Sequence, residues 1–186
     1  MRQADHLAYR IPLNAWQKGP MGMNSLVRDH LPATYFADYQ LLRAELMELL
    51  SDDDLAFRPG VGTFSLGELC REIGDIEHSY VEAFRTFRQD FEWHNPDPGV
   101  ERSVAALTAW YADMDRDLLA AIEALTDDDI ARRRIERDDF EVDLLPLAPE
   151  EADYYREALL IFGGKVSIYL RLMGRELPSQ WQHWLG

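Results

Sequence analysis

The segment from Asp75 to His78 contains residue types that commonly bind metal ions. Asp75 and His78 lie three residues apart, as do Glu72 and Asp75, so each pair shares one face if the segment is helical. Di-metal helix bundles use a Glu-x-x-His pattern from each of two helices. No second copy occurs nearer the C-terminus, where Asp153 and Glu157 are the nearest acids. One hypothesis is therefore a rebuilt metal site of Glu72, Asp75, His78 and Glu157, and the alternative is that His78 is an exposed helix residue.

Cys70 is the only cysteine, so the chain cannot form an intramolecular disulfide. A reactive thiol needs a neighbouring base or cation that lowers its pKa, and no histidine lies at a fixed local spacing from Cys70. We therefore expect a buried, inert thiol. A lone free cysteine agrees with a reducing cytoplasm.

Aromatic residues are further candidates for a binding surface. Tyr154, Tyr155 and Tyr169 could line the mouth of a pocket, although aromatic residues at helical spacing usually form a core or an interface. The tail at 181–185 reads Trp-Gln-His-Trp-Leu, and we expect it to fold back over the end of the bundle or to cover a dimer partner. The three arginines at 132–134 stand beside acidic residues, which indicates a solvated connection rather than a nucleic-acid site.

The composition is that of a globular, acidic chain. Hydrophobic residues make up 47% and charged residues 28% of 186 residues, which suits a single domain. The formal net charge of -15 repels phosphate backbones and anionic lipid heads, so nucleic acid and membrane surfaces are disfavoured as partners. No apolar run approaches the ~20 residues that span a bilayer. The first ten residues lack the hydrophobic stretch of a secretion signal, and we expect a cytoplasmic protein.

Four helices account for most of the hydrophobic periodicity. Residues 1–25 contain prolines and glycines without a helical period and are predicted to be an N-terminal extension of a bundle at 26–186. The first helix is predicted from Pro32 to Leu50, because proline fits a first helical turn. Its apolar stripe is Tyr35, Tyr39, Leu42, Leu46 and Leu49.

The second helix has the clearest start signal, since Ser65 and Glu68 form a capping-box pattern. We expect it to end before Asn95, and we expect the third helix to run from about Arg102 to Leu125. The second stripe is Leu69, Ile73, Ile76, Tyr80, Phe84 and Phe87; the third is Leu107, Tyr111, Met114, Leu118, Ile122 and Leu125.

Residues 131–147 are strongly charged and are predicted to form a long surface crossover, with a short extended piece at 140–144. The fourth helix is predicted to start near Pro149 and to end at Gly174, the residue type that favours a left-handed C-cap. Four long amphipathic helices with little strand signal predict an all-α, up-down four-helix bundle. The fourth stripe is Tyr155, Leu159, Phe162, Val166, Tyr169, Leu170 and Met173.

Three segments together resemble the DinB/YfiT-like superfamily. They are 57–69, with Phe-Arg-Pro and then Phe-Ser-Leu-Gly-Glu-Leu; 103–130, which closes on Leu-Thr-Asp-Asp-Asp-Ile; and 164–174, Gly-Lys-Val-Ser-Ile-Tyr-Leu-Arg-Leu-Met-Gly, with Pro178 after it. The third is the most specific, because it is similar to the family's ending motif. The resemblance covers roughly residues 25–182.

The resemblance implies a four-helix bundle, often dimeric, with zinc or nickel held by three histidines and with thiol-dependent transferase or hydrolase activity in several members. In this chain the three histidine positions correspond to Glu72, Ala158 and Phe162, and a glutamine of the final motif corresponds to Lys165. Alanine and phenylalanine cannot bind a metal, and one carboxylate alone binds zinc poorly. We therefore expect no metal ligands and no cofactor.

Glu72 and Lys165 are the residues at these positions that could still carry chemistry. If Glu72 points into the bundle, burial requires that it be protonated or paired, and Lys165 on the facing helix is a possible partner. The alternative is a pair at the bundle rim, with Lys165 extending to water. The predicted ligand-binding residues are Glu72, Tyr155, Ala158, Phe162, Lys165 and Tyr169.

Three functional hypotheses follow. The first is a metal-free DinB-like protein that binds a small molecule or acts as a dimeric regulatory or stress-related protein. The second is a thiol-dependent transferase or hydrolase with a relocated site, whose candidate catalytic residues are Glu72 and Lys165. The third is a purely structural or regulatory homodimer, for which the first helix paired with the fourth is a plausible interface.

Overall fold

The computed structural model describes residues 23–137, 145–179 and 182. Within these residues no helix is both long and apolar enough to cross a membrane. In chain order the elements are η2 (Leu26–His30), α1 (Leu31–Ala33), α2 (Phe36–Glu48), η3 (Asp52–Ala56), α3 (Leu66–Thr86), β1 (Arg88–Gln89), η4 (Val100–Arg102), α4 (Val104–Glu123), α5 (Asp127–Arg132), β2 (Glu136–Arg137) and α6 (Ala148–Leu172).

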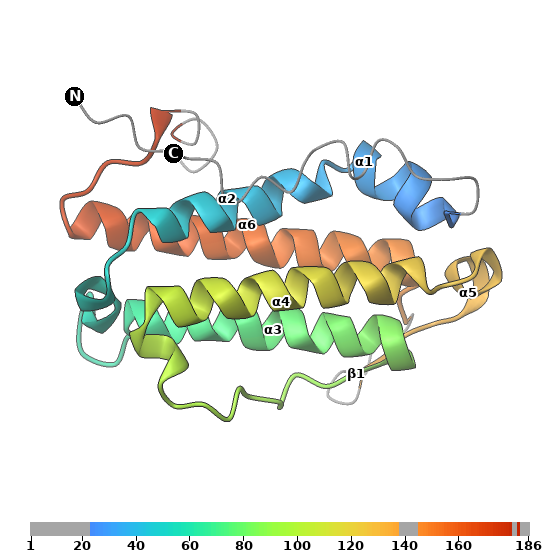
Figure 1. Cartoon of the computed structure of the whole chain (residues 1–186), viewed down its shortest axis with the longest axis horizontal. Coiled ribbons are helices and arrows are strands. Elements are labelled where there is room, and N and C mark those ends of the chain that lie inside the picture. The colour runs from blue at the N-terminus through green and yellow to red at the C-terminus, as the bar shows by residue number, and fades with distance from the viewer. Residues whose placement is uncertain (1–22, 138–144, 180–181, 183–186) are drawn as a thin grey trace.

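The four long helices α2, α3, α4 and α6 form the bundle, with α2 packed between α4 and α6, and α3 packed between the same two helices (Figure 1). The predicted all-α four-helix bundle is confirmed. Each helix buries its apolar stripe, and each large side chain removed from water contributes about 1.5–3 kcal/mol before conformational entropy is subtracted. Fully or nearly buried members are Leu42, Leu46, Ile73, Phe84, Leu107, Leu118, Leu159 and Val166.

The helix directions alternate at two of the three connections. The path reverses between α2 and α3 and again between α4 and α6, as predicted for an up-down order, but α3 and α4 run parallel (Figure 1). Near their starts the Tyr111 hydroxyl donates to the Cys70 carbonyl, and further along Arg85 pairs with Asp117. The reason is that residues 88–103 return along the bundle before α4 begins.

α2 begins later than predicted because the helix breaks at Tyr35. The predicted helix from Pro32 is divided into the single turn α1 and the longer α2, and Tyr35 between them has a left-handed backbone, with φ of 56°. Its side chain is 68% exposed, so Tyr35 does not belong to the apolar stripe. Phe36 takes that place and is buried.

α3 starts with the predicted capping box. Ser65 Oγ accepts from the Glu68 amide at 3.1 Å, and Glu68 Oε2 accepts from the Ser65 amide at 2.7 Å. The helix ends at Thr86, well before Asn95, because Phe87 adopts a left-handed conformation with φ of 62°. The chain then enters β1, which pairs in parallel with β2.

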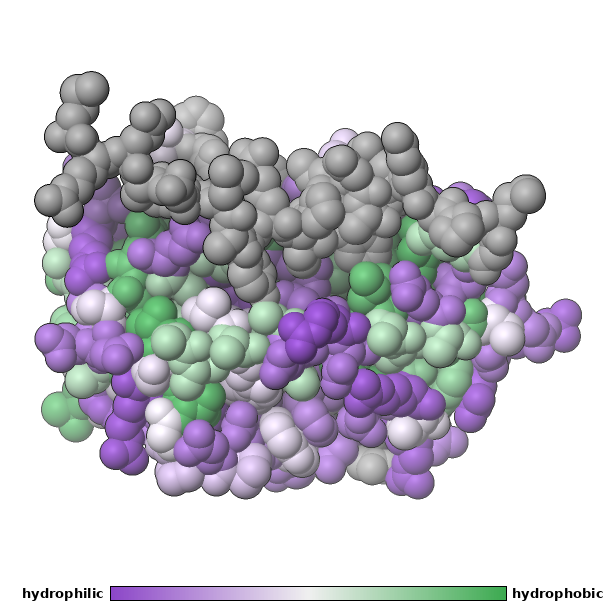
Figure 2. Space-filling view, viewed as in Figure 1, coloured by the Kyte–Doolittle hydropathy of each residue, from purple (hydrophilic) through white to green (hydrophobic). Residues whose placement is uncertain are grey.

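The other two long helices have the predicted extents to within two residues at most. Ser103 caps α4, and α6 carries a proline in its first turn. Gly174 follows α6 with φ of 73°, as expected for a left-handed C-cap. Hydrophilic side chains dominate much of the face in Figure 2, in keeping with the acidic composition.

α5 and β2, which precede α6 in the chain, lie at one end of the bundle (Figure 1). The extended piece predicted at 140–144 and the tail residues Trp181 and 183–185 lie outside the described residues. So do residues 1–22, and the division between an extension at 1–25 and a bundle at 26–186 stays a prediction. Asn24 is buried, and its Nδ2 donates to the Ile122 and Leu125 carbonyls.

Candidate functional site

A cleft of about 120 Å³ lies between α3 and α6. A water molecule occupies about 30 Å³ in the liquid, so the cleft has room for roughly four waters or a ligand fragment of similar size. Four of its lining residues are ones that the sequence singled out: Glu72, Ala158, Phe162 and Lys165. The remaining four are apolar: Leu69, Ile73, Ile76 and Ile161.

Helix geometry explains this convergence. Leu69, Glu72 and Ile76 recur at spacings of three and four on α3, and Ala158, Phe162 and Lys165 do so on α6. The two helices pack side by side in opposite directions, so these two rows face each other. The apolar members Leu69, Ile73 and Ile76 belong to the predicted stripe of α3, whereas Ile161 was not predicted.

Glu72 and Lys165 form an ion pair at the edge of this cleft. Lys165 Nζ lies 3.8 Å from Glu72 Oε2, and the two side chains are 49% and 38% exposed. The carboxylate therefore lies at the bundle rim and not in the interior. Glu72 Oε2 itself is shielded from solvent and accepts no hydrogen bond from the described residues. An unsatisfied acceptor at an apolar cleft is a feature that a ligand with an N–H or O–H donor would relieve.

The residues of this cleft do not fit a three-histidine metal centre. Ala158 and Phe162 offer a methyl group and a ring, which leaves Glu72 as the single donor. The Lys165 ammonium beside Glu72 would oppose a bound cation. Across the described part of the chain no group of three or more His, Cys, Asp or Glu side chains is arranged to hold a metal ion.

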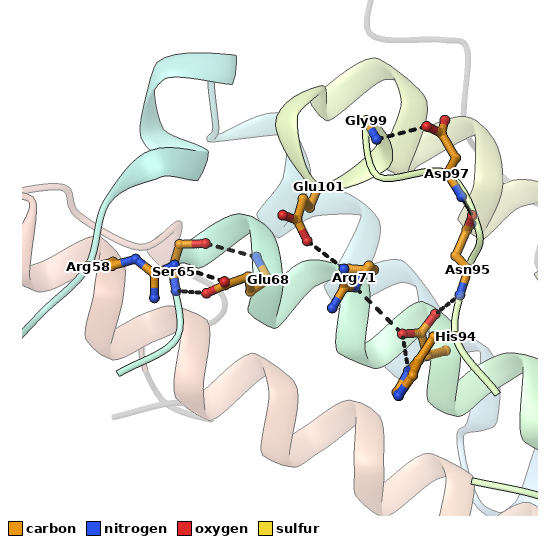
Figure 3. A network of polar contacts seen from close by, with 10 residues as sticks. Arg58, Ser65, Glu68, Arg71, His94, Asn95, Asp97, Gly99 and Glu101 are labelled. Atoms are coloured by element: carbon orange, nitrogen blue, oxygen red, sulfur yellow. Dashed lines mark hydrogen bonds and ion pairs between the residues drawn. The ribbon is translucent and has the colours of Figure 1, made fainter. Parts of the chain in front are cut away.

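The hypothesis of a rebuilt metal site of Glu72, Asp75, His78 and Glu157 is therefore wrong. Asp75 instead anchors the 88–103 crossover (Figure 3): it accepts from the His94 ring at 3.1 Å and from the Asn95 amide at 2.9 Å. Arg71 joins the Asp75 carboxylate to Glu101 in η4, just before α4.

His78 is not a simple exposed residue either. Its ring stacks on Trp93 with 3.6 Å between centroids, and burial is the main cause that lowers its pKa. The stack fastens the crossover to α3, next to the Asp75 anchor. His78 therefore serves the packing of the crossover.

Tyr155 and Tyr169 do not line the cleft. The Tyr155 side chain is fully buried, and its hydroxyl accepts from Arg43 at 3.1 Å. The Tyr169 hydroxyl donates to the Phe64 carbonyl at 2.9 Å, and its ring lies edge-on to Phe57. These two tyrosines hold the core and the loop before α3, so their prediction as ligand-binding residues is not supported by the geometry.

Tyr155 belongs to a buried polar cluster that the sequence analysis missed. Arg43 is 2% exposed; its Nη1 donates to Glu77, and its Nη2 donates to Asp115 at 2.8 Å. Gln40 also donates to Asp115, at 2.5 Å. The sequence did contain a signal for this cluster, because each of its three charged residues stands three positions before a buried residue of its own helix stripe. The pairs are Arg43 with Leu46, Glu77 with Tyr80, and Asp115 with Leu118.

The charges of this cluster favour the uptake of a proton. Two carboxylates and one guanidinium would leave a net negative charge in the core, which is costly in a medium of low polarity. Burial raises the pKa of Glu77 to about 8. The charge of the nearby Asp115 also raises this pKa, whereas Arg43 lowers it. The raised pKa of Glu77 favours its protonated form, which lessens the negative charge in the core. The cluster is structural, because none of its members lines the cleft.

Cys70 is buried, as predicted, with its sulfur 3.9 Å from the Met47 sulfur. Burial raises the pKa of the thiol to about 12, so the thiolate is not available near neutral pH.

Comparisons with known proteins bear on the fold around this cleft. A family model described as the DinB superfamily matches residues 40–148, more than half of the chain, a range that includes Glu72 but ends at the first residue of α6. A DinB-like protein from Bacillus subtilis has a similar crystal structure, with a TM-score of 0.59 and 20% sequence identity over 78% of this chain and 94% of that chain. At that identity the likeness shows the fold alone. No curated protein matches this sequence.

Proposed function

Because the chain belongs to the DinB superfamily, yet has Glu72, Ala158, Phe162 and Lys165 around its α3/α6 cleft, we propose that it binds a small molecule there without a metal ion. The observation that supports this most directly is the unsatisfied Glu72 Oε2, shielded from solvent beside an apolar cleft. The cleft walls supply hydrophobic contact, and the ion pair supplies a donor and an acceptor that fix a polar head.

The size and lining of the cleft define the ligand class. The ligand is a short amphipathic molecule whose apolar part, of roughly four to six heavy atoms, occupies the space of about four waters. Its polar head carries both a donor for Glu72 and an acceptor for Lys165, as amides and small zwitterions do. The net charge of -15 leaves nucleic acids and anionic membrane surfaces out of this proposal, and the single buried cysteine suits a cytoplasmic setting.

The test is a ligand-observed NMR screen of short amides, amines, carboxylates and zwitterions, with elemental analysis of the same protein. We expect binding without stoichiometric zinc or nickel. Glu72→Gln should weaken it by about 10-fold or more, since a hydrogen bond to a charged group contributes about 1.5–3 kcal/mol. The matched control is Glu82→Gln on the same helix, because the Glu82 side chain is 39% exposed against 38% for Glu72.

Two results would contradict the proposal. Stoichiometric zinc or nickel in the purified protein would contradict the proposal that the ligand binds without a metal ion. Equal affinities for wild type, Glu72→Gln and Glu82→Gln would place the ligand elsewhere.

An enzymatic role at the same position is the second candidate, favoured by the pairing of an acid and a base at the cleft edge. A thiol-dependent transferase or a hydrolase would use Glu72 and Lys165 for proton transfer, and any thiol would have to come from outside because Cys70 is buried. An activity that Glu72→Ala leaves untouched would remove this candidate.

We also propose that the protein is a homodimer with a regulatory role. The support is the number of large apolar side chains on the outward face of α6, since such side chains on a helix surface mark interaction sites. Sedimentation that shows a monomer at high micromolar concentration would contradict the dimer.

A further inference from the structure

The outward face of α6 has the pattern of a coiled-coil seam. Its residues at 154, 158, 161, 165, 168 and 172 are spaced four and three apart, which is the 3.5-residue repeat of packed helix pairs. The large apolar members are exposed to solvent: Tyr154 by 43%, Ile161 by 59%, Ile168 by 57% and Leu172 by 59%. Such a seam spans about 27 Å along the helix.

Gly164 lies beside this seam, and among the described residues no neighbour requires a glycine there. A Cβ at Gly164 would meet no described atom within 4 Å. By contrast, a Cβ at Gly67 would strike the Glu101 carbonyl, and one at Gly74 would strike Trp110. Glycine in the middle of a helix lowers helix stability, and an open glycine there leaves room for close approach by another helix.

Two charges flank Gly164 symmetrically. Glu157 lies seven residues before it and Arg171 seven residues after it, and both are exposed on the same side of α6. Within residues 23–137 and 145–179 neither forms an ion pair. A second α6 laid antiparallel with its centre at Gly164 would bring each Glu157 to an Arg171, whereas a parallel copy would bring like charges together.

We propose that a second copy of this chain packs its α6 antiparallel against α6, on a two-fold axis at Gly164. A two-fold interface uses the same patch on both subunits, and Glu157 and Arg171 make this patch self-complementary. Ile161, three residues before Gly164, belongs both to the seam and to the cleft lining, so the partner lies next to one edge of the cleft. This interface rests on the proposed homodimer but not on ligand binding.

Charge exchange at the two flanking positions tests the interface by sedimentation velocity. Glu157→Arg and Arg171→Glu should each weaken the dimer by about 10-fold, because each variant places like charges together twice. The double variant should return to within about 3-fold of wild type. The matched control is Arg116→Glu on the exposed face of α4, where the Arg116 side chain is 71% exposed, and it should leave the dimer unchanged.

Cysteine crosslinking tests the same axis without relying on charge. Under mild oxidation Gly164→Cys should form a disulfide-linked dimer, because the two copies of residue 164 meet on the axis. Glu157→Cys should not, because its two copies lie far apart in an antiparallel pair. Cys70 is buried and does not compete.

These experiments test the proposed α6 interface separately from the existence of a homodimer. A wild-type monomer at high micromolar concentration overturns both. A dimer that both single charge variants leave intact, or that crosslinks through Glu157→Cys and not Gly164→Cys, overturns this interface while the homodimer stands. Ligand binding at Glu72 is measured separately and decides neither result.

Discussion

At the scale of single residues, the most consequential feature is the buried cluster of Arg43, Glu77 and Asp115. Breaking such a cluster is costly because a buried charge then has no partner. The cluster joins α2, α3 and α4, and Tyr155 adds α6, so each helix of the bundle contributes a polar group at one level of the core. We therefore expect the cluster to help specify how the four helices align.

Glu77 predicts a pH dependence of stability. Its pKa is raised from an ordinary 4.5 to about 8, so the native state binds a proton that the unfolded state has lost. The unfolding free energy therefore falls as the pH rises from about 4.5 through about 8. Glu77→Gln keeps the shape and a donor of the protonated acid, and should flatten this slope.

Urea unfolding at pH 5.5 and pH 8.5 checks this. Burial raises the pKa of Glu151 as well, so some slope should remain in the Glu77→Gln variant. Equal slopes for wild type and Glu77→Gln would show that Glu77 is ionised at neutral pH.

At the scale of elements, left-handed residues decide where the helices break. Tyr35 and Phe87 both have positive φ, which costs an L-amino acid with a side chain about 1–2 kcal/mol. Their surroundings differ, since Tyr35 is 68% exposed and Phe87 only 7%. The guanidinium of Arg133 also lies over the Phe87 ring, at 3.7 Å from its centroid.

This contrast predicts opposite effects of glycine. Tyr35→Gly should raise the unfolding free energy by about 0.5–1 kcal/mol, because it removes strain and little packing. Phe87→Gly should lower it by about 3 kcal/mol or more, because the lost packing outweighs the relief of strain. Chemical denaturation measures both, and a destabilising Tyr35→Gly would show that the exposed ring makes contacts that matter.

At the scale of the whole molecule, the parallel pair of α3 and α4 depends on close approach at Gly67 and Gly74. The Glu101 carbonyl sits where a Cβ of residue 67 would be, and Trp110 sits where one of residue 74 would be. The crossover returns to the start of α3 and is fastened there through Asp75 and Arg71 (Figure 3).

Gly67→Ala should therefore destabilise the fold by about 1–3 kcal/mol, although alanine is the better helix former, because the clash is with backbone. Gly60→Ala is the matched control, since a Cβ there meets no described atom within 4 Å. Thermal unfolding compares the two, and a neutral Gly67→Ala would mean that η4 can shift away from α3 without loss.

Local patterns in the sequence were enough to determine the four helices, the Ser65 cap and the apolar stripes, because hydrogen bonding to the backbone and burial of a helix face depend on residues three and four apart. The family resemblance predicted that Glu72, Ala158, Phe162 and Lys165 lie at one site. Only the structure showed that Ile161 also lines it. Helix directions, the breaks at Tyr35 and Phe87, and the pairing of Arg43 with Glu77 were decided by tertiary structure alone. They depend on contacts between residues far apart in the chain, and the spacing of neighbouring residues does not determine such contacts.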